Sequence, residues 1–302
     1  MEISTSTNIC AFGPGRTRYP VENSIRDCAD AGYRVLDINF CMAMNPDSPM
    51  RGDGWEEYVR GIGALAEERG IRFNQSHLPY YDVGGEKDPD RAKLMEKLIE
   101  RSVRGTAMLG ARWAVTHPFT VYEAGPDTRL SKEKNLEYFF PKARLAASEG
   151  VGIALENDFE YQIGQPRRRI YCADAGELAD LADAFGDGEH VGVCYDFGHA
   201  NLTGPAFHRR NLNLIGKRLK AVHVQDNHGE RDEHLMPFFG SIDWKEAMAG
   251  LADIRFSGDL TFEIQEFGRY LPPDMKKLVP RMSLEIGKRL LELYGEALEK
   301  GE

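Results

Sequence analysis

The sequence of 302 residues lacks the features that mark membrane-spanning and exported proteins. No run approaches the roughly 18 consecutive apolar residues that a membrane-spanning helix needs, so we expect no membrane partner. The stretch that starts at Met1 shows no basic segment followed by an apolar core, and we therefore expect no export signal.

Cysteine is scarce and scattered. The five cysteines form no CxxC pair and have no zinc-ribbon spacing. An odd, dispersed set is typical of proteins from a reducing compartment, where disulfides are rare. Together with the missing export signal, this pattern predicts a cytoplasmic protein.

Positive charge is also in deficit, because the formal net charge is −10. A nucleic-acid partner is bound through clustered Lys and Arg, whose contacts release counterions from the phosphate backbone. The only dense basic run is 167–169, which we interpret as a solvated loop. We therefore expect no nucleic-acid partner.

Apolar runs that resemble strands alternate regularly with stretches that resemble helices. The eight predicted strands are 3–12, 34–40, 71–77, 112–117, 151–157, 191–199, 219–227 and 260–266. The eight predicted helices are 20–33, 53–70, 88–110, 131–149, 178–185, 206–218, 243–254 and 273–298. Asp-x-x-Glu capping patterns at 53–56, 174–177 and 243–246, and Pro89 after Asp88, indicate helix starts.

Regular alternation of this kind predicts a parallel sheet, and eight units in about 300 residues is the size of a (β/α)₈ TIM barrel. We predict that residues 1–302 form one such α/β domain. The rival fold is a doubly wound open sheet. It usually brings a Gly-rich turn after the first strand, but Gly13-Pro14-Gly15 lacks the full GxGxxG spacing.

Polar side chains recur where the predicted strands end. The residues at or just beyond the ends of the third to eighth strands are His77, His117, Glu156, Asp196 with His199, His223, and Glu263. The loop 227–241 adds His228, Asp232 and His234, so that only His190 and His208 of the eight histidines lie elsewhere. One such residue is usually structural, but six strands that end alike predict a shared polar floor at the active end of a barrel.

Imidazoles and carboxylates that converge on one rim indicate a site for one divalent metal ion. A set of Glu, Asp, His and Glu supplies three oxygens and one nitrogen, which suits Mn²⁺ first, with Mg²⁺, Co²⁺ and Zn²⁺ as alternatives. Cys194 lies two residues before Asp196 and faces the same side of its strand. We expect its thiol to pack inside the barrel, one layer below the rim.

The chain resembles the xylose isomerase-like TIM-barrel superfamily, in its sugar phosphate isomerase/epimerase branch. The resemblance covers nearly the whole chain. The segments that carry it are Leu155-Glu156-Asn157, Tyr195-Asp196-Phe197-Gly198-His199, Val222-His223-Val224-Gln225-Asp226-Asn227, residues 232–244 and Phe262-Glu263.

The ketose 3-epimerases of that superfamily hold a metal ion with one residue from each of the last four strands. The resemblance therefore implies the metal ligands Glu156, Asp196, His223 and Glu263. In those enzymes the metal chelates two adjacent oxygens of an open-chain keto sugar and stabilises the enediolate, while two glutamates move the proton.

By the same resemblance, Glu156 and Glu263 form the acid/base pair and His199 binds substrate. His77, His117, Asp232 and His234 complete the predicted substrate-binding set. The implied function is that of a metal-dependent isomerase or epimerase of a keto sugar or related polyol. Its expected partner is a small carbohydrate, and assembly into a homo-oligomer is left open.

The main alternative function is that of an abasic-site endonuclease, because such enzymes of the superfamily hold three zinc ions with nine ligands. All nine residue types occur here: His77, His117, Glu156, Asp196, His199, His223, Asp232, His234 and Glu263. The net charge of −10 argues against this rival. So does Gly164-Gln165-Pro166, which replaces the Gly-Gln-Gly loop of the nucleases.

Two further alternatives use the same site. A lyase or dehydratase of keto sugars or keto inositols would begin with the same proton abstraction and then lose a β-substituent. A metal-stabilised sugar-binding barrel would bind without turnover, and a broad sugar panel would separate it from the enzymes.

Overall fold

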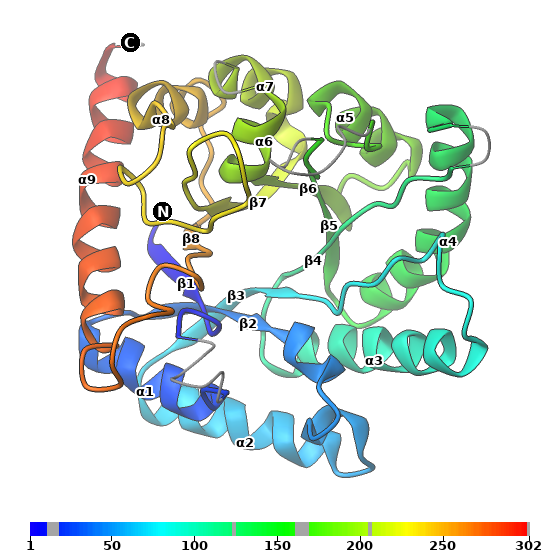
Figure 1. Ribbon diagram of the computed structural model, residues 1–302, viewed down its shortest axis with the longest axis horizontal. Coiled ribbons are helices and arrows are strands. Elements are labelled where there is room, and N and C mark those ends of the chain that lie inside the picture. Colours follow the sequence, from blue (N-terminus) through cyan, green and yellow to red (C-terminus); the bar gives the residue numbers. More distant parts are fainter. Residues whose placement is uncertain (11–17, 123–124, 161–168, 205–206, 301–302) are drawn as a thin grey trace.

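Eight parallel strands close into a barrel in chain order, which confirms the predicted TIM barrel (Figure 1). The computed structural model describes residues 1–10, 18–122, 125–160, 169–204 and 207–300. The strands are β1 (Ile3–Ser6), β2 (Val35–Asn39), β3 (Arg72–His77), β4 (Trp113–Thr116), β5 (Gly152–Glu156), β6 (Val191–Asp196), β7 (Leu219–Val224) and β8 (Leu260–Phe262). The barrel closes between β1 and β8, where Ser4 lies opposite Thr261, so the open-sheet alternative is wrong.

Helices surround the strands on the outside (Figure 1). The α-helices among the described residues are α1 (Val21–Ala31), α2 (Trp55–Glu68), α3 (Pro89–Met108), α4 (Thr128–Ser148), α5 (Ala175–Ala184), α6 (Phe197–Thr203), α7 (His208–Ile215), α8 (Trp244–Asp253) and α9 (Leu278–Lys300). Short 3₁₀ segments are η2 (Phe40–Met44), η3 (Pro49–Arg51) and η4 (Gly216–Arg218). The last helix, α9, packs against both α8 and α1 and so completes the outer ring. None of the helices in the described ranges is long and apolar enough to cross a membrane.

The predicted helix starts are confirmed at three of four positions. The carboxylates of Asp88, Asp174 and Asp243 each accept hydrogen bonds from the first amides of the helix that follows. The predicted cap at Asp53 is wrong, because Gly54 precedes α2 and no side chain caps that helix. Each cap satisfies main-chain amides in the first turn of its helix and so fixes where that helix begins.

All eight strands are shorter than predicted, and β1, β6, β7 and β8 end three or more residues before the predicted position. The strand predicted to run to His199 ends at Asp196, whose Oδ1 accepts a hydrogen bond from the His199 amide 2.7 Å away and thereby starts α6. The first strand ends at Ser6 rather than continuing to residue 12. Gly13-Pro14-Gly15, Gly164-Gln165-Pro166, Arg167 and Arg168 lie outside the described residues. Arg169 forms ion pairs with Glu160 and Glu177 and is not a freely solvated side chain.

The core has two parts. The larger part lies between the barrel and the helices, where apolar residues of both are fully buried, for example Leu155 and Leu251. A smaller layer inside the barrel consists of Val115, Ala154, Cys194 and Ala221. This layer confirms the predicted position of the Cys194 thiol. Because side chains alternate along an extended chain, the residue two positions after each of these four also points inward. Those four residues are His117, Glu156, Asp196 and His223.

Candidate metal and substrate site

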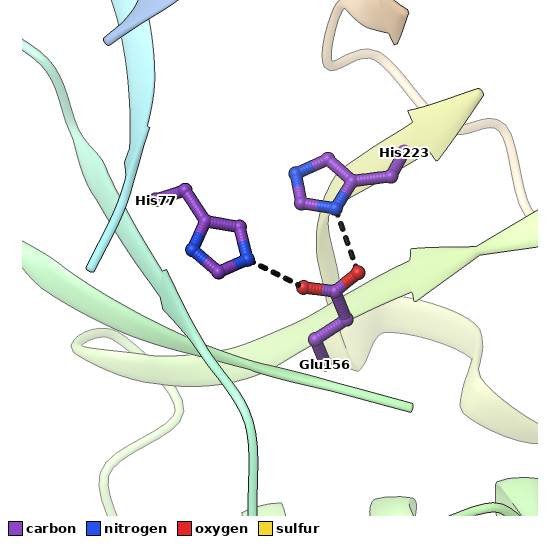
Figure 2. Close-up of side chains that lie close together, drawn as sticks. All are labelled: His77, Glu156 and His223. Carbon is purple, nitrogen blue, oxygen red and sulfur yellow. Dashed lines mark hydrogen bonds and ion pairs between the residues drawn. The ribbon is translucent and has the colours of Figure 1, made fainter. Parts of the chain in front are cut away.

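Glu156 lies at the centre of the rim formed by the carboxyl ends of the strands. Its carboxylate is fully buried between the imidazoles of His77 from β3 and His223 from β7 (Figure 2). The Oε1 atom is 2.7 Å from Nδ1 of His223, and Oε2 is 3.4 Å from Nε2 of His77. Oε2 also lies 3.2 Å from Nε2 of His117. Three strands that are far apart in the chain therefore meet at one carboxylate.

Four predicted metal ligands lie together at this point. One ligand atom from each of Glu156, Asp196, His223 and Glu263 lies within 4.8 Å of the others. Two smaller groups share Glu156, one with His77 and His223 and the other with His117 and His199. The set of three carboxylates and one imidazole is the donor chemistry of a hard or borderline divalent cation.

Two carboxylate oxygens of this group are poorly satisfied by the protein. Oδ2 of Asp196 is buried and makes no hydrogen bond. Oε2 of Glu156 is buried and has only the longer contacts to His77 and His117. A buried polar atom without a partner costs free energy, and most such atoms in folded proteins are paired. A divalent cation at this position would satisfy these atoms, so the residues that are present fit a metal ion.

The carboxylates of the site differ in their proton affinity. Burial would raise the pKa of Glu156, but the imidazoles of His223 and His117 hold it well below its usual range. Burial dominates at Asp196 and raises its pKa to about 6, although His199 opposes the shift. His223 and His234 outweigh burial at Glu263, so its pKa is lowered. Glu156 and Glu263 are therefore carboxylates at neutral pH and can accept a proton.

A second cluster lies beside the first and consists of His199, Asp232 and His234. The Oδ2 atom of Asp232 is 2.9 Å from Nε2 of His234 and 3.7 Å from Nε2 of His199. These two imidazoles outweigh the burial of Asp232 and hold its pKa well below the usual range. Conversely, burial disfavours the charged form of His234, but Asp232 raises its pKa to about 10.

Three of the histidines are oriented by main-chain carbonyl groups. The Nδ1 atom of His77 is 2.8 Å from the Leu78 oxygen, and that of His199 is 2.9 Å from the Asn157 oxygen. His234 Nδ1 lies 2.8 Å from the carbonyl oxygen of Glu263. Because a carbonyl oxygen only accepts hydrogen bonds, Nδ1 donates in each case and Nε2 faces the carboxylates. Histidines that bind metals or substrates are commonly oriented in this way.

Three polar residues of the site have no role in the sequence-based prediction. Asp37 of β2 is buried, and its Oδ2 lies 3.8 Å from Nε2 of His223. Gln225 follows β7 and donates to two carboxylates of the site. The Sγ atom of Cys41 lies 3.3 Å from Nδ1 of His77. A carboxylate in the middle of the apolar run 35–38 is the sequence feature that points to Asp37, whereas no local pattern distinguishes Gln225 or Cys41.

Aromatic rings line part of the site. Tyr80 meets His117 edge-on with ring centroids 5.0 Å apart, and Phe159 lies 5.1 Å from His199. Tyr80 is nearly half exposed, so its ring is accessible at the mouth of the site. Apolar rings beside a polar floor are typical of sites that bind small molecules.

A family model described as xylose isomerase-like TIM barrel matches residues 25–280, which is most of the chain. The protein belongs to this family. The match confirms the resemblance seen in the sequence, and the closed barrel agrees with it.

Curated relatives of two kinds are similar to this family member. An uncharacterised protein of Methanocaldococcus jannaschii is 27% identical over 229 residues, which cover 75% of this chain and 72% of that protein. A probable endonuclease 4 of Geobacillus sp. strain WCH70 is 26% identical over 200 residues, which cover 59% of this chain and 61% of that protein. The chain thus matches less than two thirds of the length of the endonuclease.

Solved structures share the fold over nearly their full length. A D-tagatose 3-epimerase-like protein superposes with a TM-score of 0.73 at 21% identity and covers 98% of this chain and 99% of its own. D-psicose 3-epimerase of Clostridium cellulolyticum H10, solved with D-tagatose, superposes at 0.73 with 16% identity and covers 96% and 99%. The IOLI protein with a bound zinc atom superposes at 0.71 with 16% identity and covers 98% and 99%. At these identities the similarity establishes the fold alone.

Proposed function

We propose that this protein is a divalent-metal-dependent isomerase or epimerase that acts on a keto sugar or related polyol. The observation that carries the proposal is the convergence of Glu156, Asp196, His223 and Glu263, one ligand atom of each lying within 4.8 Å of the others. Oδ2 of Asp196 in this group is buried without a hydrogen-bond partner. The epimerase structures with the same fold support this choice of substrate class. The partner is a small carbohydrate.

The same four residues are the proposed ligands of one divalent ion, with Mn²⁺ as the first choice and Mg²⁺, Co²⁺ or Zn²⁺ as alternatives. A bound divalent ion would supply Lewis acidity to the carbonyl oxygen of the substrate. The second cluster would contribute binding, since His199, Asp232 and His234 offer both donors and acceptors to sugar hydroxyl groups. His77 and His117 would bind hydroxyl groups on the opposite side of Glu156.

Glu156 and Glu263 are the proposed acid/base pair. Glu156 ends β5 and Glu263 follows β8. These strands are separated by β6 and β7 around the barrel, so the two carboxylates approach the centre from different directions. One carboxylate removes the proton next to the substrate carbonyl, and the other returns a proton to the opposite face. The imidazoles around them lower both pKa values, so either carboxylate can act as the base. The group that acts as the acid must first take up a proton from solvent.

Turnover in D₂O tests this assignment. Ketoses incubated with the metal-loaded enzyme should gain deuterium at the carbon next to the carbonyl and should give no elimination product. An unsaturated product would show that the enzyme is a lyase or dehydratase with the same first step. Binding without any exchange or turnover across a broad sugar panel would indicate a sugar-binding barrel instead.

A second candidate function is abasic-site cleavage. It is favoured by the cluster of His199, Asp232 and His234 beside the first group and by the similarity to a probable endonuclease 4. Metal analysis and an incision assay on duplex DNA with an abasic site distinguish the two candidates. One tightly held ion without incision supports the sugar enzyme, whereas three zinc ions with incision would establish the nuclease.

A further inference from the structure

Gln225 connects the two clusters of the site. Its side chain is fully buried directly after β7. The Nε2 atom is 3.2 Å from Oδ1 of Asp196 and 2.7 Å from Oδ1 of Asp232. An amide nitrogen carries two hydrogens, so one group can donate to both carboxylates. The reversed amide would place its oxygen against two carboxylate oxygens, which is repulsive, so this orientation is the only favourable one.

The two carboxylate oxygens of Asp196 differ in their hydrogen bonding. Oδ1 accepts from the main-chain amide of His199 at 2.7 Å as well as from Gln225. Oδ2 is buried and has no partner. The carboxylate can therefore offer one oxygen, Oδ2, to a cation, and the amide of Gln225 helps to keep the other oxygen turned away.

The Gln225 amide fits in its position because residue 198, which it contacts, is a glycine. A Cβ atom on Gly198 of α6 would lie 2.1 Å from Cδ of Gln225 and 2.4 Å from its Nε2. Such distances are far below van der Waals contact, so any side chain at position 198 would displace the amide. The position of Gln225 also depends on Asn227, whose Nδ2 donates to the Gly198 oxygen at 2.8 Å. The segment after β7 is thus hydrogen-bonded to α6 beside the Gln225 amide, which contacts the carboxylates of Asp196 and Asp232.

We propose that Gln225 is a positioning residue. It restricts Asp196 to binding the metal through Oδ2, and it fixes the position of Asp232 relative to Asp196. The inference rests on the proposed metal site and deepens it. Hydrogen-bond partners that orient metal ligands are worth about 10- to 100-fold in metal affinity. Gln225 touches neither substrate nor metal in this account and acts only through the two aspartates.

Co²⁺ binding to the metal-free full-length protein tests the proposal without relying on activity. Gln225→Met keeps the length of the side chain and removes both N–H groups. It should raise the dissociation constant for Co²⁺ by about 10- to 100-fold. It should also alter the visible absorption of the bound ion, which reports ligand geometry. The melting temperature of the metal-free protein should fall no further than in the control Ser102→Ala, which removes a buried hydrogen bond to the Leu98 oxygen within α3. Unchanged affinity and absorption would overturn the proposal.

A double-mutant cycle is a second experiment, which tests the proposal even if Gln225→Met does not fold. Gly198→Ala should weaken Co²⁺ binding by displacing the amide of Gln225. In a Gln225→Ala background, which leaves room for the new methyl group, Gly198→Ala should have little further effect. Additive losses would show that Gly198 acts through α6 alone and would contradict the proposal. If the wild-type protein bound no Co²⁺, the proposed metal site would be wrong. If the wild-type protein bound Co²⁺ and Gln225→Met bound it with the same affinity, only the positioning role would be refuted.

Discussion

Nδ1 of His223 lies 2.7 Å from Oε1 of Glu156 and 3.6 Å from Oε2 of Glu263. One imidazole from β7 thus contacts both glutamates that are proposed to move the proton. Burial opposes the charge, but the carboxylates of Glu156 and Glu263 hold the pKa of His223 well above its usual range in the metal-free protein. Because metal binding requires the neutral imidazole, loading of the site should release protons.

Removal of one ligand should empty the metal site. Asp196→Asn eliminates the negative charge of a buried carboxylate whose Oδ2 has no protein partner. We expect the dialysed variant to lose most of its metal, measured as moles of metal per chain by plasma mass spectrometry. The matched control is Asp180→Asn, which removes an exposed carboxylate of α5 that pairs with Lys132. Full metal content and activity in Asp196→Asn would show that the ligand assignment is wrong.

Replacement of a proposed acid/base residue should affect turnover more than binding. Glu263→Gln cannot accept a proton, and we expect turnover at saturating metal to fall by about 10² or more. Glu266→Gln is the control, because this residue lies three positions further on and its carboxylate pairs with Arg269. A larger loss in His117→Ala than in Glu263→Gln would favour the lyase, in which a histidine protonates the leaving oxygen.

The stability of the metal-free protein should fall as the pH rises above 6.5. The pKa of His234 is raised from 6.5 to about 10, since Asp232 outweighs the effect of burial. The folded state therefore holds this proton more tightly than the unfolded state. Its contribution is complete below pH 6.5 and is lost as the pH approaches 10.

Urea unfolding in the presence of chelator at pH 6.5, 7.5 and 8.5 measures this dependence. Asp232→Asn removes the charge that raises the pKa of His234, so the decline in the free energy of unfolding should become smaller. The control Asp253→Asn removes an exposed carboxylate paired with Arg209 and should leave the slope unchanged. Equal slopes in wild type and Asp232→Asn would contradict the prediction.

Asp226 should hold the loop that carries Asp232 and His234. Its two buried carboxylate oxygens accept hydrogen bonds from the amides of residues 227, 238 and 242 and from the indole nitrogen of Trp244. Asp226→Ala leaves these donors unpaired, and we expect a loss of about 3 kcal/mol in the free energy of unfolding. The exposed Arg231 within the loop should also become sensitive to trypsin.

A matched variant separates the loop from the helix that follows it. Asp243→Ala removes only the cap of α8, which accepts from the amides of residues 245 and 246. We expect it to cost about 1 kcal/mol and to leave Arg231 protected. Equal protease sensitivity in both variants would mean that the loop is held by α8 rather than by Asp226.

Much of the site could be predicted because its residues follow a local pattern. Glu156, His223 and Glu263 each come at or just after the end of an apolar run, and a parallel barrel brings such ends together. Asp37 was missed because it lies inside its strand, and only the inward alternation of side chains places it beside His223. The end of β6 was placed too late because Phe197, which begins α6, is as apolar as the strand before it.

Periodicity and the polar residues at the ends of six strands were sufficient to predict the number of strands, the closed barrel and the edge at which chemistry is possible. These properties depend on residues close together in the chain. Tertiary structure alone decided which atom of each residue faces the site. Oδ1 of Asp196 is engaged by Gln225 29 positions away, and Oε1 of Glu156 by His223 67 positions away. Such pairs form only when the barrel closes, because no local pattern brings together residues so far apart in sequence.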